Sequence, residues 1–328
     1  MMVRSIGILG TGSAAPAHVV TNAQLATMVA TDPEWIATRT GIRERHIADE
    51  NTASSDLAII AAQHAISAAG ITAEAIGVVI CATVTPDMLF PATACLVQHG
   101  IGASHAAAFD LSAGCSGFVY GLACAVSMLQ TGLGRYALVI GVDTLSKITD
   151  FTDRATCVLF GDGAGAVVLG PTTAGRGFLS FELGADGGGA DLLRQPAGGS
   201  RLPASYASVE ARQHCITMSG QEIFRFAVRI LGISTEAALA KAELAPSDID
   251  LLIPHQANSR IIETAIGRLE LPPEKVYINL DRYGNTSSAS IPIALDEVVR
   301  LGKLRERDLL VMVAFGAGLT WGATVVRW

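Results

Sequence analysis

Cys115 is the residue of this sequence best placed to act as a nucleophile. The apolar segment 106–111 predicts a strand that ends shortly before it, and the segment 117–131 predicts a helix that begins just after it. At a helix N-terminus, the dipole and the free backbone N–H groups favour a thiolate over a thiol. Gly114 and Gly117 would permit the sharp turn that exposes the sulfur. A cysteine buried in a tight turn explains the same pattern, so both possibilities stay open here.

His255 and Asn285 stand at similar junctions further along the chain. His255 follows the apolar run 249–254, and Asn285 precedes the helical pattern 291–301. A lone histidine at a strand end is more often structural, and an asparagine in this position is an ordinary helix N-cap. Because three residues of these types stand at three strand-to-helix junctions, a shared catalytic role explains them better than three separate structural roles. Together they indicate thiol chemistry assisted by an imidazole and an amide.

Strand and helix patterns alternate along the chain and would position these residues. Short runs rich in β-branched residues predict strands at 76–84, 106–111, 136–142, 249–254 and 309–315. Longer Ala- and Leu-rich patterns predict helices at 55–69, 117–131, 221–240 and 291–301. This alternation is typical of βαβ units, so we expect a layered α/β fold with a covered, largely parallel sheet.

The two halves of the chain show the same arrangement of elements. Cys115 opens a helix that leads to the strand 137–141, and Asn285 opens a helix that leads to 310–313. The two segments lie about 170 residues apart, a spacing that suggests a duplicated half. Cys115 and Asn285 would then occupy equivalent helix N-termini that face one another across a pseudo-twofold axis.

We place the boundary between an N-terminal and a C-terminal half at 1–172 and 173–328. The segment 184–220 is rich in glycine, alanine and proline, and it predicts a long loop between the halves. A loop of that length in a compact enzyme is usually a lid or a binding flap.

Composition limits the classes of function. Half of the 328 residues are hydrophobic, 16% are charged, and the net charge of −7 comes without a basic run, so a nucleic-acid-binding surface is not expected. Six irregularly spaced cysteines without a C-x-x-C pair fit reduced thiols better than disulfides or a zinc site. The apolar start 1–10 is short and lacks a cleavage pattern, and no run approaches about 18 apolar residues. We expect a soluble, cytoplasmic protein.

Two glycine motifs resemble nucleotide-binding sequences but lack the required context. The segment 10–15 fits a dinucleotide fingerprint, yet Pro16 and the β-branched residues after it oppose the helix that would hold the pyrophosphate. The segment 161–166 resembles a phosphate loop, but a strand pattern follows it and no Gly-Lys-Ser/Thr is present. Tight packing beside an active-site wall explains the second motif better.

At these residues the chain resembles the ketoacyl-ACP synthase III family, the initiating condensing enzymes of type II fatty-acid synthesis within the thiolase-fold superfamily. The resemblance runs from residue 5 to residue 322, and the motifs that carry it are 34–45, 114–118, 152–154, 160–165, 254–258 and 284–287. It implies a thiolase-like five-layered αβαβα fold from two duplicated halves, a homodimer, and a catalytic triad of Cys115, His255 and Asn285.

The resemblance also implies binding roles for further residues. Trp35 and Arg154 match positions that sandwich the adenine of coenzyme A, and Arg39 matches one that contacts the coenzyme. Asn258 and Phe224 match positions on the path of the coenzyme and substrate. An acidic carrier protein needs a basic landing site on this acidic enzyme, for which we propose Arg225, Arg260 and Arg268.

Two more roles concern the reacting acyl group. The backbone N–H groups of Cys115 and Ala317 would form the oxyanion hole, although the family often has glycine where this chain has Ala317. Phe90 matches a residue that reaches the acyl pocket of the partner subunit, while an ordinary core aromatic is the alternative. The starter would then be short, acetyl or a small branched acyl group.

The implied reaction joins an acyl group from coenzyme A to malonyl-ACP through a thioester on Cys115. No metal or redox cofactor is required, because coenzyme A arrives as a thioester substrate. Within the superfamily, a degradative thiolase would need a later cysteine than Cys215, and elongating synthases would have histidine at Asn285. A relative that primes polyketide or other secondary products, a Cys-His thioesterase-type hydrolase and an inactive scaffold remain as alternatives.

Overall fold

Two β-sheets form the frame of the computed structural model, which describes residues 5–328. The first has the order β1-β7-β6-β4-β5, with β1 Ile6–Ala14, β4 Ile76–Ala82, β5 Ala107–Leu111, β6 Tyr136–Thr144 and β7 Asp162–Pro171. The second has the order β11-β12-β13-β8, with β8 Gly177–Ala185, β11 Leu251–Pro254, β12 Leu309–Gly316 and β13 Thr320–Arg327. The first four residues of the apolar start lie outside the described residues.

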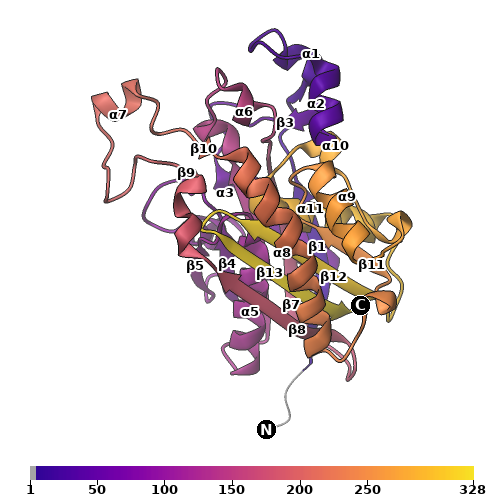
Figure 1. The fold of residues 1–328 in the computed structure, drawn as a ribbon. Helices are drawn as coiled ribbons and strands as arrows, with labels where there is room; N and C mark the ends of the chain where they lie inside the picture. The colour runs from indigo at the N-terminus through magenta and orange to yellow at the C-terminus, as the bar shows by residue number, and fades with distance from the viewer. Residues whose placement is uncertain (1–4) are drawn as a thin grey trace.

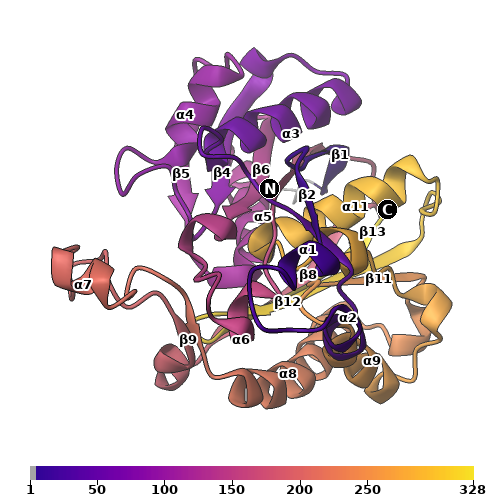
Figure 2. The ribbon, with the colours of Figure 1, turned by 90° about the horizontal axis from the view of Figure 1, so that it is seen from above.

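Helices cover the outer face of each sheet and also separate the two sheets (Figure 2). The outer helices are α3 Ser54–Ala69 and α4 Thr93–Gly100 on the first sheet, and α8 Gly220–Lys241 and α9 Ser259–Arg268 on the second. The helices between the sheets are α5 Gly117–Gln130 and α11 Ser290–Arg300. A buried apolar cluster lies beneath each of the three helical layers. The predicted five-layered αβαβα fold is therefore confirmed.

Both sheets pair their strands in the same pattern. β4 and β6 are parallel while β7 is antiparallel to β6 and β1; likewise β11 and β12 are parallel while β13 is antiparallel to β12 and β8. This correspondence is what a duplicated half produces. The expectation of a largely parallel sheet is wrong, because β13 follows β12 through a short turn and no long helix connects β6 to β7. The boundary at residue 172 stays a prediction.

The glycines of the first sheet serve close packing against helices. A Cβ on Gly10 would lie 2.4 Å from the Ala65 carbonyl oxygen of α3, and a Cβ on Gly12 would lie 2.3 Å from that of Ala61. Gly165 meets the backbone of α11 in the same way. The segment 10–15 thus runs largely within β1 instead of forming a phosphate turn, and tight packing is confirmed for the second glycine motif.

The segment 184–220 contains more regular structure than a single loop. It begins inside β8 and includes the two-stranded pair β9 Leu193–Arg194 and β10 Thr217–Met218. Between them, α7 Tyr206–Glu210 stands away from the body of the molecule (Figure 1). The composition that predicted an irregular loop concealed these short elements, since strands of two residues leave no periodic pattern. Its role as a lid stays a prediction.

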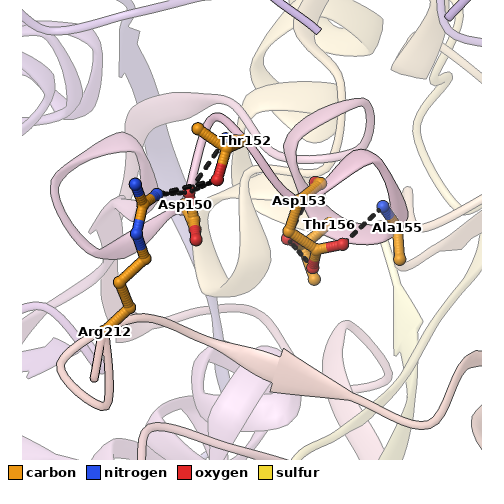
Figure 3. A network of polar contacts seen from close by, with 6 residues as sticks. All are labelled: Asp150, Thr152, Asp153, Ala155, Thr156 and Arg212. Carbon is orange, nitrogen blue, oxygen red and sulfur yellow. Dashed lines mark hydrogen bonds and ion pairs between the residues drawn. The ribbon is translucent and has the colours of Figure 1, made fainter. Parts of the chain in front are cut away.

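We call the segment 193–218, from β9 through α7 to β10, the projecting arm, and a polar network fixes its base (Figure 3). Arg212 donates to the Asp150 carboxylate and to the Thr152 hydroxyl, and Asp150 also accepts the Thr152 backbone N–H at 2.8 Å. One residue further on, Asp153 caps the short helix α6, Arg154–Cys157. The arm is therefore tied to the turn that carries Arg154.

Gly12→Ala should lower the free energy of unfolding by about 1–3 kcal/mol, because the new Cβ would meet α3 backbone that no rotamer change can move. Gly267 in α9 has open space around its Cβ position, so Gly267→Ala should raise that free energy by about 0.5–1 kcal/mol. Urea denaturation of both variants makes the comparison. Equal changes in the free energy of unfolding of Gly12→Ala and Gly267→Ala would contradict the packing argument.

Candidate active site

Cys115 lies in the one-turn 3₁₀ helix η2, Gly114–Ser116, directly before α5. Gly114 has a φ of 54°, and a Cβ there would lie 2.6 Å from the Ala317 nitrogen. A Cβ on Gly316 would likewise lie 2.4 Å from the Cys115 nitrogen. The turn of Cys115 and the turn after β12 therefore touch backbone to backbone. Among residues 5–328, no backbone carbonyl is found to accept the Ala317 N–H.

His255 follows β11 and is held by contacts on three sides. Its backbone N–H donates to the Val313 carbonyl at 2.8 Å, and its ring packs edge-on against Phe315 at 5.4 Å between centroids. Its Nδ1 lies 2.7 Å from the Ser290 hydroxyl, which also accepts the Gln256 N–H at 3.3 Å. Because the hydroxyl then has its own proton to give, it donates to Nδ1, and the network assigns the ring proton to Nε2.

Asn285 lies just before the 3₁₀ turn η7, Ser287–Ala289, which leads into α11. Its backbone accepts the Gly161 N–H at 3.0 Å and donates to the Leu159 carbonyl at 2.9 Å. Its side-chain oxygen accepts the Ser287 N–H at 2.9 Å. The amide NH₂ is therefore the end of the side chain left to donate elsewhere. As predicted, Cys115 and Asn285 both stand just before a central helix, α5 and α11, but a 3₁₀ turn lies at each junction: Cys115 lies within η2, and Asn285 precedes η7.

The three residues meet in one cavity. Cys115, His255 and Asn285 line a space of about 100 Å³ together with Phe224 and Asn258, which we call the His255 cavity. Cys115 also lines a second space of about 170 Å³, which we call the apolar cavity because most of its lining is apolar. Its other lining residues include Ala317, Val84, Leu145, Ile148, Phe160, Leu193 and Ile216. The thiol thus stands where the two spaces join. Within residues 5–328, no cluster of His, Cys, Asp or Glu has a metal-site arrangement.

Comparison with known proteins identifies the family. The model described as 3-oxoacyl-[acyl-carrier-protein (ACP)] synthase III matches residues 109–187, and the model of its C-terminal part matches residues 239–328. The β-ketoacyl-[acyl-carrier-protein] synthase III of Symbiobacterium thermophilum is 57% identical over 328 residues, 100% of this chain and 99% of the relative. This chain belongs to the 3-oxoacyl-[acyl-carrier-protein] synthase III family.

Solved structures of the family share the fold. The crystal structure of 3-oxoacyl-[acyl-carrier-protein] synthase III from Aquifex aeolicus VF5 has a TM-score of 0.91 at 44% identity and covers 98% of this chain and 100% of its own. The priming β-ketosynthase of the R1128 polyketide biosynthetic pathway also has a TM-score of 0.91, at 34% identity, covering 98% of this chain and 96% of its own. The thiolase-like fold class predicted from sequence is confirmed.

The residues predicted to bind coenzyme A lie on neighbouring elements. The Arg154 guanidinium stands over the Trp35 ring at 5.0 Å from its centroid. Trp35 and Arg39 both lie on α2, Pro33–Thr40, and the Asn258 amide donates to the Arg39 carbonyl at 3.1 Å. Since Asn258 also lines the His255 cavity, these residues connect the exposed Trp35 with the cavity. Their roles in coenzyme binding stay predictions.

The three arginines proposed for the carrier protein do not lie together. The Arg260 guanidinium lies 6.0 Å from the centre of the Phe224 ring and so stands beside the cavity that Phe224 lines, whereas Arg225 on α8 is exposed and pairs with Glu222. Arg268 ends α9, eight residues after Arg260 and about 12 Å further along the helix. Arg260 therefore stands beside the cavity, and a carrier site shared with Arg225 and Arg268 stays a prediction.

Phe90 is not the core aromatic that its residue type favours. It is 84% exposed, and its neighbour Leu89 is 79% exposed. Neither cavity at Cys115 in this chain includes Phe90 in its lining. The side chain is therefore available to another molecule, while its predicted place in the acyl pocket of a partner subunit stays untested.

Asp143 is a residue of the site that the sequence reasoning missed. It is fully buried at the end of β6, where it accepts the Val84 N–H at 2.8 Å and the Ser288 hydroxyl at 2.8 Å. Burial raises the pKa of its carboxyl group, and these hydrogen bonds oppose that rise. The carboxylate ties β6 to the turn after Asn285. A charged residue directly after the apolar strand pattern 136–142 was the available signal.

Burial controls the protonation of both reactive side chains. It raises the pKa of the Cys115 thiol to about 12, with repulsion from Asp143 adding to the effect. It lowers the pKa of His255 to about 3. The lowered thiol pKa expected from the helix N-terminus is not found, because taking a thiolate out of water opposes ionisation more than the nearby donors favour it. Both groups are neutral at physiological pH in the free site.

The alkylation rate of Cys115 by iodoacetamide should rise about tenfold per pH unit from pH 7 to pH 9.5, because the thiolate fraction of a thiol with a pKa of about 12 grows at that rate. Mass spectrometry of the Cys115 peptide measures the rate against that of exposed Cys95. A plateau below pH 8 would show that the helix N-terminus dominates after all.

Proposed function

We propose that this enzyme condenses a short acyl group from coenzyme A with malonyl-ACP, releasing carbon dioxide and forming 3-oxoacyl-ACP. This is the initiating condensation of type II fatty-acid synthesis. The observation that carries the proposal is the meeting of Cys115, His255 and Asn285 at one cavity in a chain that belongs to the synthase III family.

In the first half-reaction, the Cys115 sulfur attacks the carbonyl carbon of the acyl-CoA thioester. The oxyanion that develops accepts hydrogen bonds from the Cys115 and Ala317 N–H groups, which stand on two turns in direct backbone contact. The bond from carbon to the coenzyme sulfur then breaks, and the thiol proton leaves with coenzyme A. The acyl chain enters the apolar cavity.

In the second half-reaction, malonyl-ACP loses carbon dioxide and leaves an enolate. Its oxygen accepts hydrogen bonds from the His255 Nε2–H and the Asn285 NH₂, the two donors that the Ser290 and Ser287 contacts leave free. The enolate carbon attacks the acyl carbonyl, and the Cys115 sulfur departs. A histidine kept neutral by burial suits this task, because it donates a hydrogen bond without giving up a proton. The Cys115 sulfur departs as a thiolate and takes up one proton from water, so the complete cycle needs this chain, the two thioester substrates and that proton.

The apolar cavity indicates the starter group. Its volume of about 170 Å³ fits a few carbon atoms, at about 30 Å³ for a group the size of water, so we propose acetyl or a small branched acyl group. The exposed Leu89 and Phe90 support a homodimer in which Phe90 of a second copy closes the pocket. We place the enzyme in the cytoplasm with its carrier protein. Within residues 5–328, no helix has the length and apolarity to cross a bilayer.

Two other activities are less well supported. A polyketide-priming role would match the R1128 synthase, which is 34% identical, whereas the Symbiobacterium relative is 57% identical. A Cys-His hydrolase needs His255 to accept the thiol proton, but the Ser290 contact leaves a proton on the Nε2 that would have to accept it. The initiating condensation of fatty-acid synthesis agrees both with the higher identity of the Symbiobacterium relative and with the proton on the His255 Nε2.

Substitution of the three site residues should separate the half-reactions. Cys115→Ala should abolish acylation by acetyl-CoA and retain malonyl-ACP decarboxylation. His255→Ala and Asn285→Ala should still form acyl-Cys115 but decarboxylate about 10²–10³ times more slowly, the usual effect of removing an oxyanion donor. Acyl mass on the Cys115 peptide and released carbon dioxide are the two measurements.

Exposed His105 provides the control for these variants, since His105→Ala should leave both half-reactions unchanged. If wild-type Cys115 gained no acyl mass, the proposed function would fail. If His255→Ala blocked acylation while decarboxylation continued, His255 would be the base of the thiol and the hydrolase mechanism would be favoured.

Charge reversal at Arg260 should impair the carrier step alone. Arg260→Glu should raise the KM for malonyl-ACP about fivefold, as expected for a charge at the rim of an interface, and should spare acylation by acetyl-CoA. Arg268→Glu, at the far end of α9, is the matched control and should change this KM less. Equal effects of the two variants, or equal loss of both half-reactions, would argue against a carrier site at the entrance.

A further inference from the structure

Ser287 has an unusual backbone conformation beside the nucleophile. It opens η7, is 2% exposed, and has a φ of 51°. A residue with a side chain pays about 1–2 kcal/mol in this left-handed region relative to the ordinary helical one. Such strain persists only where the surroundings enforce it, and it is concentrated at functional sites.

The neighbours of Ser287 fix its position. Its N–H is bound by the Asn285 side-chain oxygen at 2.9 Å. The next hydroxyl, that of Ser288, donates to Asp143 and is also 2.8 Å from the Ala82 carbonyl. A Cβ on Gly141 would lie 2.2 Å from the Ser288 carbonyl oxygen, so the turn has no room to relax. The Ser287 side chain therefore projects from a turn that is anchored on both sides.

The Ser287 hydroxyl lies near the Cys115 sulfur and the Asp143 carboxylate without a hydrogen bond to either. Among residues 5–328, its oxygen forms no hydrogen bond although it is buried. Ser287 lines the apolar cavity together with Cys115. A buried hydroxyl without a hydrogen-bond partner normally destabilises a protein. We therefore expect the Ser287 hydroxyl, which lines the apolar cavity, to gain a hydrogen-bond partner during the reaction.

The Cys115 sulfur is the group beside it that lacks a dedicated donor. The Cys115 and Ala317 N–H groups serve the acyl oxygen, and the His255 and Asn285 donors serve the enolate. Asp143 disfavours a thiolate on Cys115, whereas the Ser287 hydroxyl lies close enough to both groups to lower the pKa of the thiol and that of the Asp143 carboxyl group. No other group of the site is assigned to the charge that develops on sulfur.

We propose that the Ser287 hydroxyl is a catalytic hydrogen-bond donor to the Cys115 sulfur as that sulfur becomes anionic. It would act when the thiol loses its proton to attack acyl-CoA, and again when the thiolate leaves during condensation. The overall step stays balanced, because the new bond joins the sulfur to the acyl carbon and the thiol proton departs with coenzyme A. Ser287 keeps its own proton. The catalytic part of this proposal rests on the proposed function.

Ser287→Ala, Ser287→Gly and Thr286→Val make the test. Ser287→Gly removes the hydroxyl and also relieves the left-handed conformation, so it keeps the test valid if the alanine variant folds poorly. Thr286 is the matched control, since its hydroxyl is also buried and unpartnered within the described chain but lines neither cavity. Alkylation of Cys115 by iodoacetamide at pH 8 isolates the sulfur, because that reaction forms no oxyanion.

Both Ser287 variants should be alkylated about 5- to 20-fold more slowly than wild type. This range combines a lost hydrogen bond to a charged group with the greater nucleophilicity of a more basic thiolate. Acylation by acetyl-CoA should slow in parallel, while malonyl-ACP decarboxylation should stay within about twofold, the effect expected when no enolate donor is removed. Thr286→Val should match wild type in all three measurements.

Wild-type alkylation rates in both Ser287 variants would overturn the proposal. A wild-type alkylation rate in Ser287→Gly together with a slow rate in Ser287→Ala would also overturn it, because the effect would then come from backbone conformation. An equally slow alkylation in Thr286→Val would overturn it as well. If wild-type Cys115 were alkylated normally but never acylated, the proposed function would fail. The alkylation comparison would still decide whether Ser287 acts on the sulfur.

Discussion

Direct backbone contact between turns from the two halves of the chain is the constraint on which this structure depends. The turn of Cys115 meets the turn after β12 at Gly114 and Gly316, and β6 meets η7 at Gly141, in each case without space for a Cβ. Turns packed this closely place backbone N–H groups and side chains from both halves around a single sulfur atom. The active site is therefore a property of the interface between the halves, and neither half contains it alone.

Burial of polar groups follows from that packing and determines the chemistry. Water is excluded from His255 and Asp143, so each buried polar side chain needs a partner from another element. The Ser290 hydroxyl serves His255, and the strand-end N–H groups and Ser288 serve Asp143. The same exclusion keeps the thiol and the imidazole neutral. The groups around the reacting atoms are thus mainly neutral hydrogen-bond donors. Such donors suit a reaction whose intermediates carry negative charge on oxygen and sulfur.

The projecting arm stands away from the body of the molecule, and the side chains of Leu89 and Phe90 are largely exposed. Residues of the arm line both cavities, among them Leu193, yet the arm is attached to the body partly through the exposed Arg212 and Asp150 contact. The anchored turns of Cys115 and Asn285 hold the reacting groups, whereas the arm supplies part of the cavity walls.

The sequence by itself predicted five of the main strands, four of the main helices and the three junctions at which Cys115, His255 and Asn285 stand, and the family resemblance implied the five layers. These features follow from local periodicity and from motifs that occur in order along the chain. Tertiary structure alone decided the mixed strand directions, the exposure of Phe90, and the ring nitrogen of His255 that carries the proton. The last depends on Ser290, 35 residues away, and the thiol pKa depends on how deeply the sulfur is enclosed. Such properties arise from contacts between distant segments and from exclusion of water, which no local pattern encodes.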